Sequence, residues 1–221
     1  MPPGRTSGFT RVAEAGADSR QRARARSRTG LGGSARLLAT LGCGVDCVEL
    51  SPDDCAGAAL LNRLTGLDLI DVHHASALDL PLADGSFDVI WMQTVGMNIA
   101  DKRKLYGEIH RVLEPGGRYV FQEMVAGEAA TSPCFPLPWA TDPGDSFLLS
   151  AEETRSVLGE SGFIAELFED TSDAHLSRGT VDSGPSPLTW GSTSTISRER
   201  PKTRGAASRR ATSGSSEVSS G

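Results

Sequence analysis

The chain has 221 residues, of which 38% are hydrophobic, and its 28 Asp and Glu outnumber its 22 Lys and Arg to give a net charge of -6. Residues 1–28 carry seven Arg against two acids, and residues 174–221 carry seven Lys or Arg against three, so residues 29–173 hold the whole negative excess. Because phosphate binding requires clustered Lys and Arg, so acidic a middle excludes a specific nucleic-acid interface there.

The spacing of apolar residues predicts an alternation of helices and strands through this middle. In chain order it predicts helix 34–42, strand 44–50, helix 55–66, strand 67–75, strand 87–93, helix 101–114, strand 117–126, helix 150–162 and strand 163–170. Such an alternation implies right-handed crossovers and a mostly parallel, doubly wound sheet. We therefore expect one α/β domain over residues 29–173.

Local signals predict where several of these elements begin and end. Ser51 or Asp53 is the expected N-cap of the second helix, and Ser150 with Glu153 has the spacing of a capping box. The run Pro115-Gly116-Gly117 is expected to stop the helix that precedes it.

The two flanking segments have a different composition. Residues 1–28 are basic, and residues 174–221 are rich in Ser, Gly and Arg without apolar periodicity. Neither can bury enough apolar surface to offset its ordering entropy, so we expect both to be disordered. No apolar run approaches the roughly 20 residues of a membrane helix, and the N-terminus lacks the apolar stretch of a signal peptide. We expect a cytoplasmic protein without a membrane partner.

The potential metal ligands do not form a metal-binding pattern. The four cysteines have neither paired zinc-site spacing nor the density of a disulfide framework, and we interpret them as buried reduced thiols; they are Cys43, Cys47, Cys55 and Cys134. His73 and His74 are adjacent, which fits two opposite faces of a strand better than one metal site. We expect no metal.

Three features are expected to meet at the carboxyl edge of the sheet, where doubly wound folds bind ligands. The first is the loop Gly30-Leu31-Gly32-Gly33. The second is Glu49, which ends a strand 19 residues after Gly30 and can accept both hydrogen bonds of a ribose diol. The third is the stretch SALDLP (76–81), where the backbone and Asp79 could meet an adenine amino group.

Together these segments resemble the class I S-adenosylmethionine-dependent methyltransferases, in particular the small-molecule branch called methyltransferase type 11. The resemblance covers roughly residues 29–172 and is carried by TGLGGSARLLA, CVELSPD, ASALDLPLADGSFDVIWMQ, MNIADKRKLYGEIHRVLEPGGRYV, PWATDP and SAEETRSVLGESGF. It implies a Rossmann-like sheet with strand order 3-2-1-4-5-7-6 and methyl transfer from S-adenosylmethionine to a small molecule. The implied cofactor contacts are Gly30, Gly32, Glu49, Ser76, Ala77, Leu78 and Gln93.

A nicotinamide-dependent Rossmann enzyme is the alternative, because it also binds its cofactor at a glycine-rich loop between a strand and a helix. It requires a G-x-G-x-x-G loop, whereas the chain has G-x-G-G.

A sulfonium is already an activated methyl donor, so the methyltransferase interpretation requires positioning and water exclusion more than a strong base. We expect Gln93, Met97 and Asn98 to position the reactants, with Gln93 and Asn98 as the candidate catalytic residues. Trp139, Asp142 and Phe147, in a Pro-rich loop, are expected to cover the substrate together with Met97.

The chain departs from the family pattern at both ends. Arg26 stands where the family has an acid ending an apolar first strand, and Arg28 stands where it has a glycine. Nothing after residue 173 reads as a seventh strand. We therefore expect the sheet to lack its first and seventh strands, and we hypothesise that both ends come from shifted reading frames or a decaying gene.

Three functions from different classes follow from this pattern. The leading one is methyl transfer to a small molecule, and the alternative is a non-catalytic remnant of a methyltransferase with impaired cofactor binding. A basic-tailed interaction protein is the third, favoured only if the Arg-rich ends bind an acidic partner.

Overall fold

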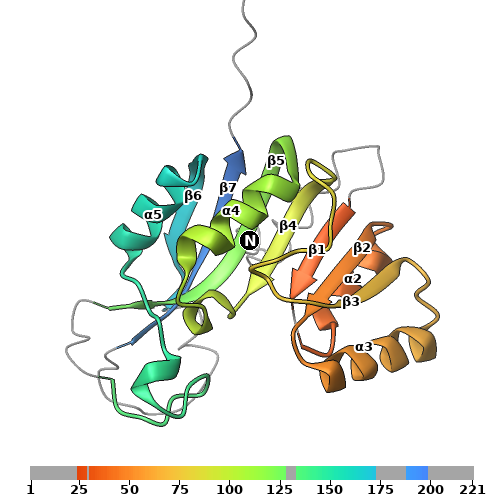
Figure 1. Ribbon diagram of the computed structural model, residues 1–221, viewed down its shortest axis with the longest axis horizontal. Coiled ribbons are helices and arrows are strands. Elements are labelled where there is room, and N and C mark those ends of the chain that lie inside the picture. The colour runs from red at the N-terminus through yellow and green to blue at the C-terminus, as the bar shows by residue number, and fades with distance from the viewer. Residues whose placement is uncertain (1–23, 29, 128–132, 173–187, 199–221) are drawn as a thin grey trace, which may run out of the picture.

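A computed structural model describes residues 24–28, 30–127, 133–172 and 188–198, and the side chains of residues 30–127 and 133–172 (Figure 1). In chain order the elements are β1 (Arg24–Arg28), α2 (Gly33–Thr40), β2 (Gly44–Glu49), α3 (Pro52–Thr65), β3 (Ile70–His74), β4 (Phe87–Gln93), η1 (Gly96–Asn98), α4 (Lys102–Val112), β5 (Leu113–Ala126), η2 (Pro143–Asp145), α5 (Ala151–Glu160), β6 (Phe163–Asp170) and β7 (Leu188–Arg198). The prediction of a Rossmann-like α/β domain is confirmed.

The strands form a single seven-stranded sheet in the order β3-β2-β1-β4-β5-β7-β6. Neighbouring strands from β3 to β5 are parallel, whereas β7 is antiparallel to both β5 and β6. The direction of winding reverses between β1 and β4, and a doubly wound sheet opens its ligand crevice at that point.

The two terminal strands correct the prediction that the sheet lacks them. Arg24–Arg28 pairs in parallel with both β2 and β4, with Arg26 opposite Asp46 and Ile90, and Leu188–Arg198 lies between β5 and β6. The prediction relied on side-chain hydrophobicity, but a ladder forms through backbone N–H and C=O groups that every residue except proline supplies. Of the segments expected to be disordered, residues 1–23, 174–187 and 199–221 lie outside the described residues.

Two apolar layers cover the two faces of the sheet. Figure 1 shows α4 and α5 side by side in front of the strands, and their side chains join the larger cluster, which includes Ile90, Leu105 and Leu158. α2 covers the opposite face, where Ala35 packs with Trp91. Successive residues of β4 alternate between the layers because strand side chains alternate faces.

The predicted helix signals are largely confirmed. Ser51 is the N-cap of α3 and accepts from the amide of Asp54, while Ser150 and Glu153 form the expected capping box of α5. The prediction for α4 was wrong at its end: the helix stops at Val112, and Leu113 already pairs with Phe87 as the start of β5. The strand therefore runs through the Pro-Gly-Gly sequence that was expected to precede it.

The cysteine prediction holds only in part. All four cysteines are reduced thiols, but Cys134 is exposed and only Cys47 is fully buried. Within the described part of the chain, no helix has the length and apolar character needed to span a membrane.

Candidate active site

The glycine loop joins β1 to α2 at the centre of the sheet. Gly30 and Gly32 have φ of 50° and 79°, a left-handed conformation that favours glycine. A Cβ added to Gly32 would lie 3.2 Å from Nη1 of Arg36, whereas one added to Gly30 or Gly33 would have no heavy atom of the described residues within 4 Å. Among the side chains that the structure describes, none caps the start of α2. Backbone amides at this helix terminus can therefore be approached closely by a ligand.

Glu49 ends β2 at the carboxyl edge of the sheet and is 6% exposed. Its Oε1 accepts hydrogen bonds from the amides of Leu50, at 2.7 Å, and Ser51, at 3.2 Å. These bonds fix the carboxylate at the turn into α3, so the residue shapes the turn as well as offering an acceptor to a ligand.

The segment between β3 and β4 contains the predicted adenine edge. Ala77 is buried, Ser76 and Leu78 are partly buried, and Asp79 is exposed. The Ser76 hydroxyl accepts from the amide of Leu78 at 3.1 Å. This local bond gives the segment a fixed turn directly after β3.

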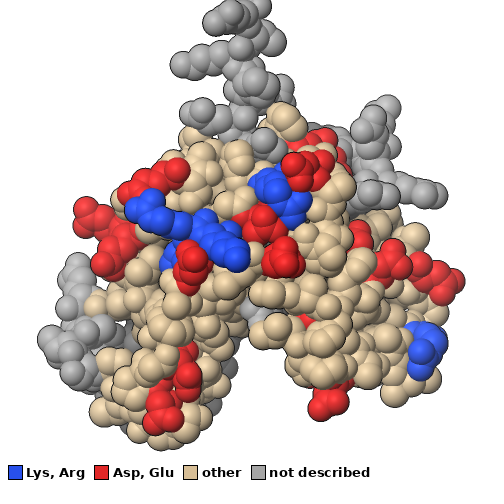
Figure 2. All heavy atoms as spheres, viewed as in Figure 1, with Lys and Arg blue, Asp and Glu red and all other residues tan. Residues whose placement is uncertain are grey.

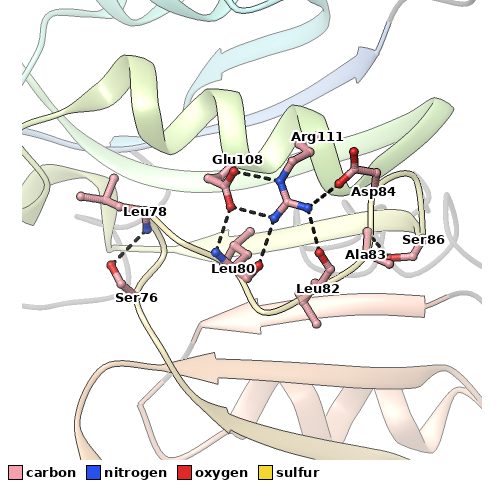
Figure 3. A network of polar contacts seen from close by, with 9 residues as sticks. All are labelled: Ser76, Leu78, Leu80, Leu82, Ala83, Asp84, Ser86, Glu108 and Arg111. Carbon is pink, nitrogen blue, oxygen red and sulfur yellow. Dashed lines mark hydrogen bonds and ion pairs between the residues drawn. The ribbon is translucent and has the colours of Figure 1, made fainter.

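A side-chain network from α4 holds the rest of this segment (Figure 3). Arg111 donates to the carbonyls of Leu80, at 3.0 Å, and Leu82, at 2.8 Å, and to Asp84 at 2.6 Å. It also bonds both carboxyl oxygens of Glu108, at 2.9 and 2.8 Å, and Glu108 accepts from the amide of Leu80 at 2.9 Å. All five N–H groups of the guanidinium are thereby used. We call this set of contacts the Arg111 network.

Gln93 ends β4 and connects two neighbouring elements. Its Oε1 accepts from the Ser34 hydroxyl at 3.3 Å, and its Nε2 donates to Oε1 of Gln122 at 2.9 Å. The polar row Ser34-Gln93-Gln122 thus crosses the switch point from α2 to β5. Sequence reasoning identified only its middle member.

The turn after Gln93 has a strained backbone and is held by two buried charged side chains. Thr94 has a φ of 49°, which is rare for a β-branched residue. Glu123 of β5 is 4% exposed, and its Oε1 accepts from the amides of Val95, at 3.1 Å, and Gly96, at 2.8 Å. Lys102 donates to the carbonyl of Gly96. Both ends of the Gly96 residue are therefore held by buried charged groups that the sequence analysis missed.

The Pro-rich loop docks on the same turn. The amide of Phe147 donates to the carbonyl of Met97 at 2.7 Å, and the side-chain amide of Asn98 donates to the carbonyl of Trp139 at 3.3 Å. Trp139 also donates from its indole to the Ser146 hydroxyl at 3.2 Å. The structure thus brings four predicted positioning and substrate residues together, although the Met97 side chain is buried rather than presented to a ligand.

One predicted substrate residue is not joined to this group by a hydrogen bond between described residues. Asp142 is exposed at the start of η2, and its carbonyl accepts from the amide of Asp145 within the same turn.

The surface over α4 and α5 carries both signs of charge (Figure 2). Arg103 pairs with Glu160, and Arg111 pairs with Asp84 and Glu108. On this face basic side chains are interspersed with acids, which does not match the continuous basic surface that a phosphate backbone requires.

Residues 29–121 match the family model described as a methyltransferase domain. These residues include the glycine loop, Glu49, the adenine edge and Gln93. This match spans less than half of the 221-residue chain, and over it the chain is similar to methyltransferase domains.

Two curated relatives are similar to this chain over short stretches. A glycine/sarcosine/dimethylglycine N-methyltransferase of Actinopolyspora halophila is 39% identical over 103 residues, which are 46% of this chain and 18% of the relative. The chloroplastic tocopherol O-methyltransferase of Arabidopsis thaliana is 36% identical over 117 residues, covering 47% of this chain and 32% of the relative. The matched stretch therefore spans a third or less of either relative.

A solved structure shares the fold of this protein over most of the chain. The cyclase SpnF superposes with a TM-score of 0.70 at 20% identity, over 87% of this chain and 80% of the cyclase. SpnF is named for a cyclase activity and not for methyl transfer. Fold likeness at this identity therefore leaves the reaction to be argued from the site.

Proposed function

We propose that the chain transfers a methyl group from S-adenosylmethionine to a small-molecule acceptor at the carboxyl edge of the sheet. The observation that carries the proposal is the convergence of the glycine loop, Glu49, residues 76–79 and Gln93 around the switch point between β1 and β4. Relatives of the matched segment are methyltransferases of an amine and of a tocopherol, which supports a small acceptor without choosing its nucleophile.

The described residues fit the cofactor in three respects. The space above Gly30 and Gly33 allows the backbone at the start of α2 to meet the methionine part. Glu49 places a carboxylate where a ribose diol can donate to it. Residues 76–79 offer backbone groups and the Asp79 carboxylate to the adenine.

The bound cofactor supplies a methyl group on a positively charged sulfur, which a nucleophile can attack directly. The chain then has to orient an acceptor and exclude water. We propose that Gln93, held by Ser34 and Gln122, and Asn98, held against the Trp139 carbonyl, orient the reactants. The loop carrying Trp139, Asp142 and Phe147 covers the acceptor, and Met97 contributes its backbone carbonyl to the docking of that loop.

A non-catalytic remnant is the second candidate, and a specific observation favours it. β1 lies between two parallel strands at the centre of the sheet, yet three of its five residues are Arg. Arginine is rarely placed in a strand with neighbours on both sides, because its charge is costly to bury. Such a strand could weaken the glycine loop that follows it.

Calorimetric titration of S-adenosylmethionine into the full chain separates the two candidates. Micromolar binding that weakens at least tenfold in Glu49→Gln supports the proposal, because the amide keeps one acceptor for the turn but loses the charge. Asp68→Asn, at an exposed position before β3, is the matched control and should bind as the wild type does. Absence of binding in the wild-type chain would favour the remnant.

A further inference from the structure

The turn Thr94–Asn98 follows β4 and is held in an unusual way. Thr94 is in the left-handed region, and its amide donates to the carbonyl of Gln122 at 2.7 Å. Strained backbone of this kind persists only where the surrounding structure determines it, and it concentrates at functional sites. The strained residue directly follows Gln93, the candidate catalytic residue that ends β4.

Glu123 and Lys102 enclose the turn at Gly96. The carboxylate of Glu123 accepts from the Val95 and Gly96 amides, and the ammonium of Lys102 donates to the Gly96 carbonyl. A Cβ on Gly96 would lie 3.2 to 3.3 Å from the carboxyl atoms of Glu123, so a larger residue would have to displace the carboxylate by a few tenths of an ångström. We call this arrangement the Gly96 clamp.

The clamp is costly to build, which argues against incidental packing. Glu123 is 4% exposed and Lys102 is 9% exposed, and burying both charges carries a large desolvation penalty. The second carboxyl oxygen of Glu123 is buried and receives no well-formed hydrogen bond from the described residues. A buried carboxylate that is not fully satisfied lowers stability, so its presence calls for a role other than stability.

The last two residues of the clamped turn, Met97 and Asn98, contact the Pro-rich loop. The Met97 carbonyl holds the Phe147 amide, and the Asn98 side chain holds the Trp139 carbonyl. The turn therefore connects the buried charges of Glu123 and Lys102 to residues 133–149 through hydrogen bonds.

We propose that Glu123 and Lys102 are positioning residues for the methyl acceptor, acting through the Gly96 clamp to hold Asn98 and the docked Pro-rich loop in place. This inference rests on the proposed function for its catalytic meaning, but the clamp itself is testable without an acceptor. Neither residue touches the reactants directly.

The clamp should respond to pH near neutrality. Burial raises the pKa of Glu123 to about 7, against the amides of Val95, Gly96 and Met97 and the charge of Lys102, which lower it. Burial lowers the pKa of Lys102 to about 8, against the charge of Glu123. Tyr106, the other titratable group facing Glu123 from α4, has its pKa raised by burial and by that carboxylate, so its phenol stays neutral in this range.

These shifts define when both charges are present. Glu123 is ionised above about pH 7 and Lys102 is protonated below about pH 8. Opening the turn returns both groups to water and toward their ordinary pKa values, so protonation of Glu123 below about pH 7 and deprotonation of Lys102 above about pH 8 each favour the closed turn. The turn should therefore be held least tightly between the two values.

The test is hydrogen exchange of the full chain, followed by mass spectrometry in peptides covering 94–99 and 133–149, from pH 5.5 to 9.5 after correction for intrinsic rates. Protection of both peptides should pass through a minimum between about pH 7 and 8 and rise roughly tenfold on either side. Glu123→Gln should remove the acid limb and Lys102→Met the alkaline limb. The exposed Glu169→Gln, on β6, is the matched control and should keep the whole profile.

Protection of the two peptides that does not change with pH in the wild-type chain would overturn the clamp. This result does not depend on the folding of any variant. Equal exchange of both peptides in Glu123→Gln and in the wild type at pH 7.5 would overturn it as well. A profile confined to residues 94–99 would overturn the link to the Pro-rich loop.

Steady-state kinetics test whether the clamp positions the methyl acceptor. Glycine, sarcosine and dimethylglycine serve as acceptor probes. Glu123→Gln should raise KM for the acceptor about tenfold while the affinity for S-adenosylmethionine, measured by calorimetry, stays within twofold. An unchanged KM would overturn the positioning role. Turnover with none of the probes would count against the proposed function alone, because the exchange profile decides the clamp independently.

Discussion

Replacing Arg111 by Lys tests whether the Arg111 network holds the adenine edge. The guanidinium makes five hydrogen bonds, two of them to the backbone carbonyls of Leu80 and Leu82. An ammonium has three donors from one atom and cannot span these acceptors. At least two bonds are therefore lost, and the pKa of Arg111, raised first by its hydrogen bond to Glu108, shows that the carboxylates favour its charged form.

The expected cost follows from those two bonds. A hydrogen bond to a charged group contributes about 1.5–3 kcal/mol when buried. The Arg111 side chain is 31% exposed, so water can replace part of each bond, and about 1 kcal/mol per lost bond is appropriate. Arg111→Lys should lower the free energy of unfolding by about 2 kcal/mol, or Tm by about 4–8 °C for a chain of this size.

The same perturbation should reach the cofactor, because the loosened segment follows Ala77 and Leu78. If the whole loss were expressed in binding, the Kd for S-adenosylmethionine would rise about 30-fold, which is the upper bound. Urea unfolding followed by circular dichroism gives the stability, and calorimetry gives the affinity. Arg103→Lys is the control on the same helix, since the Arg103 side chain is 72% exposed. A change below about 0.5 kcal/mol in Arg111→Lys would refute the reasoning.

Four further outcomes are expected. The folded state raises the pKa of Glu123 from 4.5 to about 7, so wild-type stability should fall by up to about 3 kcal/mol between pH 4.5 and 7, and Glu123→Gln should lose this slope in urea titrations. Gly96→Ala should cost about 1–3 kcal/mol of unfolding free energy by crowding Glu123. Gly57→Ala should be neutral or stabilising by up to about 1 kcal/mol, because its Cβ meets only the exposed Leu31 side chain; a loss above 1 kcal/mol would contradict this. Ser150→Ala removes both the cap and its box and should cost about 1 kcal/mol, seen as a lower urea midpoint.

Much of the fold is visible in the sequence where the signal is local. The predicted strands 87–93 and 163–170 match β4 and β6 residue for residue, because each is an apolar run bounded by a turn. The capping box at Ser150 is confirmed for the same reason. β1 and β7 escaped prediction because their place in the sheet depends on partners far along the chain rather than on their own apolar content.

The site is predictable to a similar extent. The glycine loop and Glu49 follow from their order and spacing, and the structure places the loop at the switch point and Glu49 at the end of the neighbouring strand β2. Glu123 could not be found in this way, since a single acid in a strand usually reads as solvent-facing. The signal that was present is its position after three apolar or aromatic residues of GRYVFQE, in a strand covered on both faces. The Arg111 network is a set of side-chain to backbone contacts about 30 residues apart, which no local pattern encodes.

The insertion of β7 between β5 and β6 imposes an order on folding. β6 is translated before β7 but has no sheet neighbour other than β7 among the described strands. Until residues 188–198 arrive, the edge of β5 beside Tyr119 and Phe121 stays unpaired, and an unpaired edge next to a large apolar surface is a template for aggregation. A chain shortened to residue 187 should therefore be recovered chiefly in the insoluble fraction, and a peptide of residues 188–198 added during refolding should rescue it. The outer half of the sheet therefore depends on the last of the described strands to leave the ribosome.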